Sequence, residues 1–386
     1  MSVASLNIRD EVVASDFTSA QLGQVFRRAR QYIDKDPDLK PRYDFARQVV
    51  RAFRTPAFYE VETRCNLKCE GCYYFEGGTT HSIKGEVDSR KWRQFFEAES
   101  KRGVSMAYFV GAEPALAQDR LHQAVGLFPR GNVGTNGTIK IDPDIPFRIG
   151  VSVWGGDDVM DKTMRGASVF RKALKNYAGD PRVIMLFTVS SWTIDQIPMV
   201  AKMCTDNGLK LTFNLYSPTT QFITRLTKNS PNDSQFFRVS SKDHSPIFDA
   251  KTLERARIAM NAAIDAWPDT VVYSKAYNDF ICKPSPRYDI DPSTGIARDC
   301  KSRIVEPMRY FTTDLKQTNV KCGTPEANCA DCRMYSGGWS SRFVPRSEDV
   351  ATAEAFSAWI GMMETLDEIF LYPRVSHSFE KNRLRD

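Results

Sequence analysis

The feature that most constrains the fold of this 386-residue chain is an alternation of short apolar runs with amphipathic stretches between residues 56 and 216. Runs with the length and composition of β-strands occupy 57–62, 105–111, 131–137, 147–155, 181–190 and 210–217. Helical spacing of apolar residues occurs at 88–103, 116–128, 167–178 and 194–207. In the first of these helices, Asp88 is the expected N-cap and Gly103 the stop signal. This order predicts parallel strands joined by helical crossovers, in an open sheet or a (β/α) barrel, with the chemistry at the carboxyl ends of the strands.

The alternation ends near residue 217. Residues 217–235 are polar and rich in turn formers, which predicts a surface loop. A helix is expected near 250–266, followed by an aperiodic stretch of cysteines and prolines from 280 to 340 and a closing amphipathic helix at 348–370. We therefore expect four parts: an N-terminal helical segment (1–50), a barrel core (51–245), a small loop-rich domain (246–345), and a C-terminal helix and tail (346–386).

The composition is that of a protein able to bury a core, with 42% hydrophobic and 26% charged residues. The net charge of +6 is mild, and the basic run at 27–30 has the pattern of a solvated helix face, so we expect no nucleic-acid partner. No run of about 18 apolar residues predicts a membrane span, and the first residues lack the pattern of a signal peptide. We expect a cytoplasmic protein, where clustered thiols usually mean metal or redox chemistry.

Eight of the nine cysteines fall into two groups. The first group is Cys65, Cys69 and Cys72, spaced C-x3-C-x2-C directly after the first predicted strand. A structural zinc site needs four ligands, and His81 is the one further candidate nearby. Three thiolates on a cubane 4Fe–4S cluster would instead leave one iron open to a ligand that binds through nitrogen and oxygen.

With its neighbouring motifs, this group resembles the radical S-adenosylmethionine (SAM) superfamily over residues 56–217. The motifs that carry the resemblance follow successive strands and are "GAEP" (111–114), "TNGT" (135–138), "VSVWGG" (151–156) and "DKTMRGASVF" (161–170). On this resemblance, the three cysteines hold the 4Fe–4S cluster, and SAM contacts are expected from Gly111, Ala112, Glu113, Pro114, Thr135, Asn136, Ser152 and Tyr73. Two positions depart from the family pattern. Gly71 stands where an aromatic residue is usual, with Tyr73 or Tyr74 as replacement, and Ala112 stands where a second glycine is usual.

The resemblance also implies a chemistry. The reduced cluster passes an electron to the sulfonium of SAM, and the resulting 5′-deoxyadenosyl radical abstracts hydrogen from an unreactive C–H bond or adds to the substrate. A flavodoxin or a ferredoxin-type protein is the implied electron donor. The sequence singles out no catalytic residue beyond the cofactor ligands.

The second group of cysteines lies in the aperiodic segment and comprises Cys282, Cys300, Cys322, Cys329 and Cys332. Paired cysteines in a loop-rich stretch predict a structural metal site, and zinc is the simplest interpretation of the metal. The C-x12-G-x4-C element that ends at Cys300 and the closing "CADC" also resemble the auxiliary-cluster domain called SPASM or, in its one-cluster form, twitch. Five cysteines suit one auxiliary 4Fe–4S cluster. On this resemblance, Cys282, Cys300, Cys329 and Cys332 are the preferred ligands, and Cys322 is a substitute ligand or a free thiol.

Several other residues have both a functional and a structural interpretation. Cys204 lies in a helical pattern and is expected to be a small buried side chain. Asp161 and Arg165 could close over SAM or form a surface pair on a helix. Asn214 and Tyr216 lie at the end of the last predicted strand, and they either line a pocket or pack against neighbouring side chains.

The resemblance as a whole implies an α/β enzyme with a partial (β/α)6 TIM-like barrel and a small loop-rich C-terminal iron–sulfur domain. The expected substrate is a small molecule or natural-product intermediate that undergoes oxidation or rearrangement. Two alternatives within enzymes are a maturase of a ribosomally made peptide and adenosyl transfer to a lipid. A structural or electron-transfer iron–sulfur or zinc protein is the alternative outside enzymes, but it would not need the motifs at 111–114 and 135–138.

Overall fold

The computed structural model describes residues 19–75, 83–284, 287–324 and 326–375. The strands are β1 (Pro56–Glu62), β2 (Met106–Gly111), β3 (Gly131–Thr135), β4 (Arg148–Val153), β5 (Val183–Val189), β6 (Lys210–Leu215) and β7 (Arg309–Phe311). The α-helices are α1 (Ser19–Lys35), α2 (Leu39–Arg51), α3 (Ser89–Lys101), α4 (Gln118–Ala124), α5 (Asp158–Arg165), α6 (Phe170–Tyr177), α7 (Ile197–Asp206), α8 (Thr220–Thr227), α9 (Ala250–Ala266), α10 (Lys275–Ile281), α11 (Tyr335–Ser340) and α12 (Ala353–Phe370). Short 3-10 turns are η2 (Pro114–Ala117), η3 (Ile194–Gln196) and η4 (Glu348–Val350).

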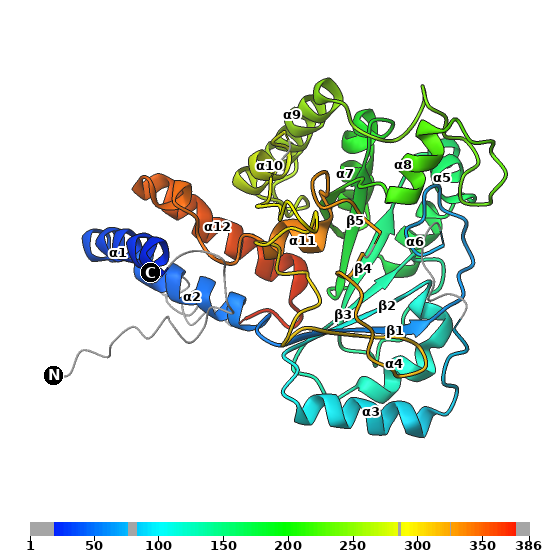
Figure 1. Cartoon of the computed structure of the whole chain (residues 1–386), viewed down its shortest axis with the longest axis horizontal. Helices are drawn as coiled ribbons and strands as arrows, with labels where there is room; N and C mark the ends of the chain where they lie inside the picture. The colour runs from blue at the N-terminus through cyan, green and yellow to red at the C-terminus, as the bar shows by residue number, and fades with distance from the viewer. Residues whose placement is uncertain (1–18, 76–82, 285–286, 325, 376–386) are drawn as a thin grey trace.

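The described strands form one parallel sheet in the order β6-β5-β4-β3-β2-β1-β7. Helices lie between β1 and β2, β2 and β3, β4 and β5, and β5 and β6, whereas residues 136–147 join β3 to β4 without a helix (Figure 1). This architecture confirms the α/β class and the parallel core of a partial barrel. All six predicted strands are present within a few residues of their expected bounds. The strand β7 was not predicted; it comes from the aperiodic C-terminal segment and pairs with the first half of β1.

One face of the sheet packs against the connecting helices. Tyr59 of β1 lies edge-on to Phe96 of α3, with ring centroids 5.3 Å apart. The helix α3 begins as predicted, because the Asp88 side chain accepts a hydrogen bond from the backbone N–H of Arg90. Gly103, just after its end, has a φ of +86°, as a glycine stop requires.

The opposite face carries aromatic side chains near its β7 edge. Phe58 stacks on Tyr108 of β2 at 4.7 Å and on Tyr310 of β7 at 5.7 Å. Side chains alternate along a strand, so Phe58 points away from the α3 side on which Tyr59 lies. Met308 completes this buried cluster from the C-terminal segment. The C-terminal segment therefore contributes to the inner face of the partial barrel.

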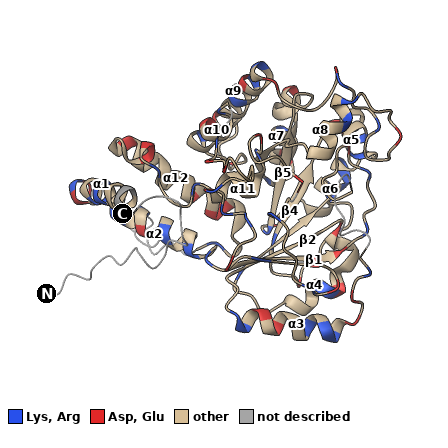
Figure 2. Cartoon of the chain, viewed as in Figure 1, with Lys and Arg blue, Asp and Glu red and all other residues tan. Residues whose placement is uncertain are grey.

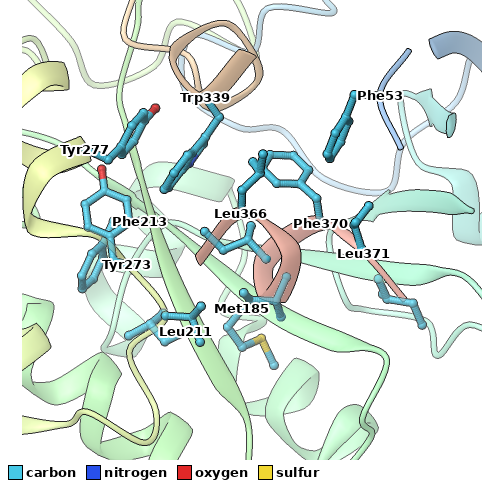
Figure 3. Close-up of a cluster of buried hydrophobic side chains, with 14 of the residues drawn as sticks. Phe53, Met185, Leu211, Phe213, Tyr273, Tyr277, Trp339, Leu366, Phe370 and Leu371 are labelled. Carbon is cyan, nitrogen blue, oxygen red and sulfur yellow. The ribbon is translucent and has the colours of Figure 1, made fainter. Parts of the chain in front are cut away.

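The C-terminal helix α12 connects the sheet to the first helices. Figure 3 shows Phe213 of β6, Trp339 of α11 and Phe370 of α12 in one buried cluster. Phe370 also meets Phe53, which follows α2, edge-on at 5.9 Å. The helices α1, α2 and α12 lie together on one side of the molecule (Figure 1), where α12 packs on α2.

One segment differs from its prediction. Residues 220–227, within the expected surface loop, form α8, and Thr219 caps it by accepting from the N–H of Phe222. Phe222 and Leu226 are buried, so this short helix packs despite its polar sequence. The sequence did not predict this helix, because three apolar residues in eight, of which only Phe222 and Leu226 are buried, are a weak signal.

Charged residues lie on many elements (Figure 2). Arg27, Arg28 and Arg30 are exposed on α1, which agrees with the predicted solvated helix face. Within the described part of the chain, no helix is both long and apolar enough to cross a membrane.

Candidate functional site

The first cysteine group lies on a loop that directly follows β1. Backbone hydrogen bonds fix this loop to distant segments. The N–H of Lys68 donates to the carbonyl of Arg165 at 3.1 Å, and the N–H of Glu70 donates to that of Met164 at 2.7 Å, both at the end of α5. The loop is thereby held at the carboxyl edge of the sheet, where a (β/α) fold has its active site.

A buried carboxylate between Cys69 and Cys72 ties the loop to a second segment. The Glu70 side chain is fully buried and accepts hydrogen bonds from the N–H groups of Arg238 at 2.8 Å and Ser240 at 3.1 Å. Gly71 adds a backbone bond to the Phe236 carbonyl at 2.7 Å. The sequence did not predict this role of Glu70, because its hydrogen-bond partners are about 170 residues away in the chain.

The three thiols influence one another electrostatically, and burial and nearby polar groups act on them in opposite directions. Burial raises the pKa of each thiol, and nearby Cys69 adds to the rise at Cys72, where the pKa reaches about 12. The Arg165 guanidinium opposes this rise at Cys69, because a positive charge favours the thiolate. The Cys65 sulfur accepts from the N–H of Leu67 at 3.4 Å and the side-chain amide of Asn136 at 3.8 Å. Donors of this kind stabilise sulfur ligands of a metal group.

The backbone conformation at Gly71 and the space around it account for the glycine found at this position. It has a φ of +63°, a conformation that side chains other than glycine rarely adopt. A Cβ at this position would collide with the phenol oxygen of Tyr216 and lie 3.0 Å from the Phe222 ring. Tyr216, just after β6, therefore occupies the space beside the third cysteine, and Trp154 lies edge-on to it at 5.9 Å.

The "GAEP" motif is shaped by its backbone. Gly111 has a φ of +134°, and a Cβ there would collide with the Glu62 carbonyl. The N–H of Ala112 donates to the same carbonyl at 2.9 Å. This holds the end of β2 close to the end of β1, and Pro114 then begins η2.

Glu113 connects this motif with the next one. Its carboxylate is buried and accepts from the Thr135 hydroxyl at 2.6 Å, the Asn136 N–H at 2.7 Å and the Ala115 N–H at 2.9 Å. Burial raises the pKa of Glu113, and these three donors partly offset it. The side chain is thus committed to holding the end of β3, which makes it a positioning residue.

Asn136 completes a continuous network to the cysteine loop. Its side-chain amide donates to Asn66 at 2.7 Å, next to its contact with Cys65. Its side-chain oxygen accepts from the Thr138 hydroxyl at 2.6 Å. The structure therefore brings together the predicted residues Cys65, Glu113, Thr135 and Asn136.

Arg165 contradicts the alternative of a surface pair on a helix. It is 1% exposed, and its guanidinium donates to the carbonyls of Ser152 at 2.6 Å and Asn136 at 3.3 Å. Asp161 is equally buried and accepts instead from the N–H groups of Val169 and Phe170. Arg165 thus joins the ends of β3 and β4 to the cysteine loop, next to half-buried Ser152.

The remaining aromatic candidates follow the third cysteine. Tyr73 is partly buried, and burial followed by the nearby Cys72 and Glu60 raises its pKa. Tyr74 is buried and lies edge-on to Phe75 at 5.2 Å. His81 lies outside the described residues. Asn214, the partner of Tyr216 in the prediction, accepts from the backbone N–H of Tyr335, which ties β6 to α11.

The second group of cysteines divides in the structure. One cavity in the C-terminal segment is lined by Cys300, Cys322, Cys329 and Cys332, and Cys282 is not among its lining residues. Cys282 is 7% exposed just after α10, and its thiol donates to the side-chain oxygen of Asn278 at 3.4 Å. Cys204 is fully buried in α7, as predicted.

Within the described residues, no three His, Cys, Asp or Glu side chains converge on the position of a single metal ion. In a cubane each thiolate binds its own iron, so such convergence is not what a 4Fe–4S site requires. A separate cavity of about 220 Å³ lies between α2, α12 and the amino-terminal half of β1, and Cys300 also borders it.

No family model matches the sequence, and no curated protein matches it. Among solved structures, the chain is similar to Streptococcus suis SuiB bound to S-adenosylmethionine, at 13% identity and a TM-score of 0.46, covering 68% of this chain and 59% of that one. It is also similar to SuiB bound to precursor peptide SuiA, at 13% identity and a TM-score of 0.46, covering 80% of this chain and 66% of that one. Histidine-tagged anSMEcpe with bound AdoMet is similar at 16% identity and a TM-score of 0.47, covering 73% of this chain and 79% of that one. The chain thus spans less than two thirds of these SuiB chains.

At these identities and TM-scores the likeness carries no argument about the chemistry of this chain. The chain's own parallel sheet confirms the α/β fold class that the sequence analysis predicts.

Proposed function

We propose that this protein is a radical SAM enzyme that uses a 4Fe–4S cluster on Cys65, Cys69 and Cys72. The strongest support is the hydrogen bond from the Asn136 amide to the Cys65 sulfur. It joins the cysteine loop to the motif after β3, and Glu113 joins that motif to the one after β2. A purely structural metal site would not require a hydrogen-bond network that joins the ends of three strands.

The bound cluster, when reduced, supplies the electron that cleaves SAM to a 5′-deoxyadenosyl radical. The chain's own residues prepare the site for this. The donors from Leu67 and Asn136 and the positive charge of Arg165 stabilise sulfur ligands that must be anionic. Glu113 keeps the end of β3 in position, and the glycine at position 111 lets the end of β2 lie close to the end of β1.

Tyr216 and Trp154 have a second role in this proposal. They lie edge-on to each other at the carboxyl ends of β6 and β4, next to the third cysteine. Aromatic side chains in this position exclude water from the site, which protects a reactive radical from quenching.

For the substrate we propose a small molecule or natural-product intermediate from which hydrogen is abstracted, with a ribosomally made peptide as the alternative. The C-terminal thiols would hold an auxiliary cluster. An electron donor of the flavodoxin or ferredoxin type would reduce the protein.

The test is reconstitution with iron and sulfide under anaerobic conditions, followed by reduction in the presence of SAM. The protein should hold about eight irons per chain and release 5′-deoxyadenosine. Changing Cys65, Cys69 and Cys72 together to Ala should leave about four irons and abolish release. The matched control is Cys204→Ala, which should retain both. Release of 5′-deoxyadenosine by the triple variant would refute the site.

A further inference from the structure

We propose that the C-terminal cluster is bound by Cys300, Cys322, Cys329 and Cys332, and that Cys282 is not a ligand. This inference rests on the auxiliary cluster of the proposed function and differs from the ligand set that the sequence resemblance implies. It assigns a binding role to Cys322 and a purely structural one to Cys282.

The first argument is the shared cavity. The four proposed ligands line one cavity, whereas Cys282 does not reach it. Gly337 also lines this cavity, and a Cβ at Gly337 would lie only 3.3 Å from the Cys300 sulfur. A larger side chain at this position would therefore crowd the sulfur, and glycine leaves room beside it.

The backbone brings Cys322 to Cys300. Cys322 forms an antiparallel bridge with Arg303, and the N–H of Ile304 donates to the Lys321 carbonyl at 3.0 Å. Arg303 follows Cys300 by three residues, so this pairing carries Cys322 to the same place. Cys332 donates its N–H to the Cys329 carbonyl at 3.4 Å, in the tight turn that a C-x2-C pair needs.

The structural role of Cys282 is visible in its contacts. Its thiol donates to the Asn278 side chain one helical turn earlier, and Asn278 in turn donates to the Arg257 carbonyl at 2.8 Å. Cys282 belongs to the hydrophobic core that includes Tyr277 and Trp339. To bind iron in the cavity it would have to leave these contacts.

The charges around the cavity suit an anionic group. A 4Fe–4S cluster held by four thiolates is an anion in its common oxidation states. Arg303 and Lys321 line the cavity. The buried Arg287 lies beside Cys332, to whose carbonyl it donates at 3.1 Å. These cations offset the cost of placing a negative group in a partly buried site.

The test uses the full chain carrying Cys65, Cys69 and Cys72 changed to Ala, so that iron reports on the second group alone. This background should hold about four irons after reconstitution. Adding Cys282→Ala should leave the iron content and the electron paramagnetic resonance spectrum of the reduced cluster unchanged. Adding Cys322→Ala should alter that spectrum, because one iron of the cluster loses its thiolate ligand.

Circular dichroism controls for folding. If the Cys322 variant fails to fold, the Cys282 variant still decides, because an unchanged spectrum of the reduced cluster supports the inference and an altered spectrum overturns it. An unchanged spectrum of the Cys322 variant also overturns it. A background without iron overturns this inference and the auxiliary cluster, whereas SAM cleavage by the unmodified protein is tested separately.

Discussion

Tyr216 fills the space next to Gly71 that a side chain at that position would need. The two residues are far apart in the sequence and meet where β6 ends beside the cysteine loop. The phenol oxygen of Tyr216, which follows another strand, thus lies where a side chain at position 71 would begin.

The first prediction concerns this pair. Gly71→Ala should destabilise the cysteine loop by about 1–2 kcal/mol for its left-handed conformation, with a further cost for the collision with Tyr216. Part of that further cost should disappear when Tyr216→Phe removes the phenol oxygen. A double-mutant cycle measured by chemical unfolding separates the two contributions. Equal costs of Gly71→Ala in both backgrounds would contradict the contact.

The second prediction concerns Glu113. Glu113→Gln should weaken SAM binding by about tenfold or more, because an amide group would face one of the three donors that the carboxylate now accepts, at a cost of about 1–3 kcal/mol. Equilibrium binding of SAM to the reconstituted protein measures the loss.

Glu354→Gln is the matched control, because Glu354 is exposed in the first turn of α12. It should bind SAM like the unmodified protein. Equal affinities for both variants would show that Glu113 does not position the site.

The third prediction concerns Arg165. Arg165→Lys should speed the loss of the first cluster to an iron chelator, because an ammonium cannot donate to the Ser152 and Asn136 carbonyls in the fork geometry of a guanidinium. Arg171→Lys, at an exposed position of the neighbouring helix α6, is the control. The second cluster should be lost at an unchanged rate in both variants. Identical rates for the first cluster would argue against this role.

The fourth prediction concerns pH and a pair remote from the cysteines. Burial alone would raise the pKa of Asp180, but hydrogen bonds from Arg182 outweigh it and hold the pKa below its ordinary value. A lowered pKa in the folded state means that the ionised group stabilises the fold above its unfolded pKa, about 3.9, and that this stability is lost as the pH falls through the lower, folded value.

Asp180→Asn should therefore lower the free energy of unfolding at neutral pH, by a difference that shrinks as the solution is acidified below about pH 4. Urea unfolding of the iron-free chain across this range measures the difference. A difference that does not change with pH would mean that the Asp180 charge contributes nothing.

Much of the core could be predicted from the sequence, because β1 to β6 are apolar runs whose period and length distinguish them from the helices between them. The strand β7 could not, because three residues carry no periodicity, and its place beside β1 depends on the fold of the C-terminal segment. The same limit applies to α8, whose buried face consists of Phe222 and Leu226.

The residues of the candidate site likewise fall into those that the sequence could identify and those whose roles depend on tertiary contacts. Cys65, Glu113 and Asn136 belong to local motifs and could be named in advance. Tyr216 and Arg165 each had two interpretations, and the sequence could not choose between them because their roles depend on partners that lie on other elements. Cys322 is similar: the sequence resemblance made it a substitute ligand or a free thiol, whereas the bridge to Arg303 brings it to Cys300.

The measurement that bears most directly on the proposed active site is pulsed electron paramagnetic resonance of the reduced protein with SAM labelled by ¹⁵N at the amine and ¹⁷O at the carboxylate. The Cys300, Cys322, Cys329 and Cys332 positions should be changed to Ala, so that only the first cluster contributes. An open iron on Cys65, Cys69 and Cys72 predicts hyperfine coupling to both labels. A fourth protein ligand on that iron, seen as coupling that persists without SAM and no coupling to either label, would contradict the proposed function.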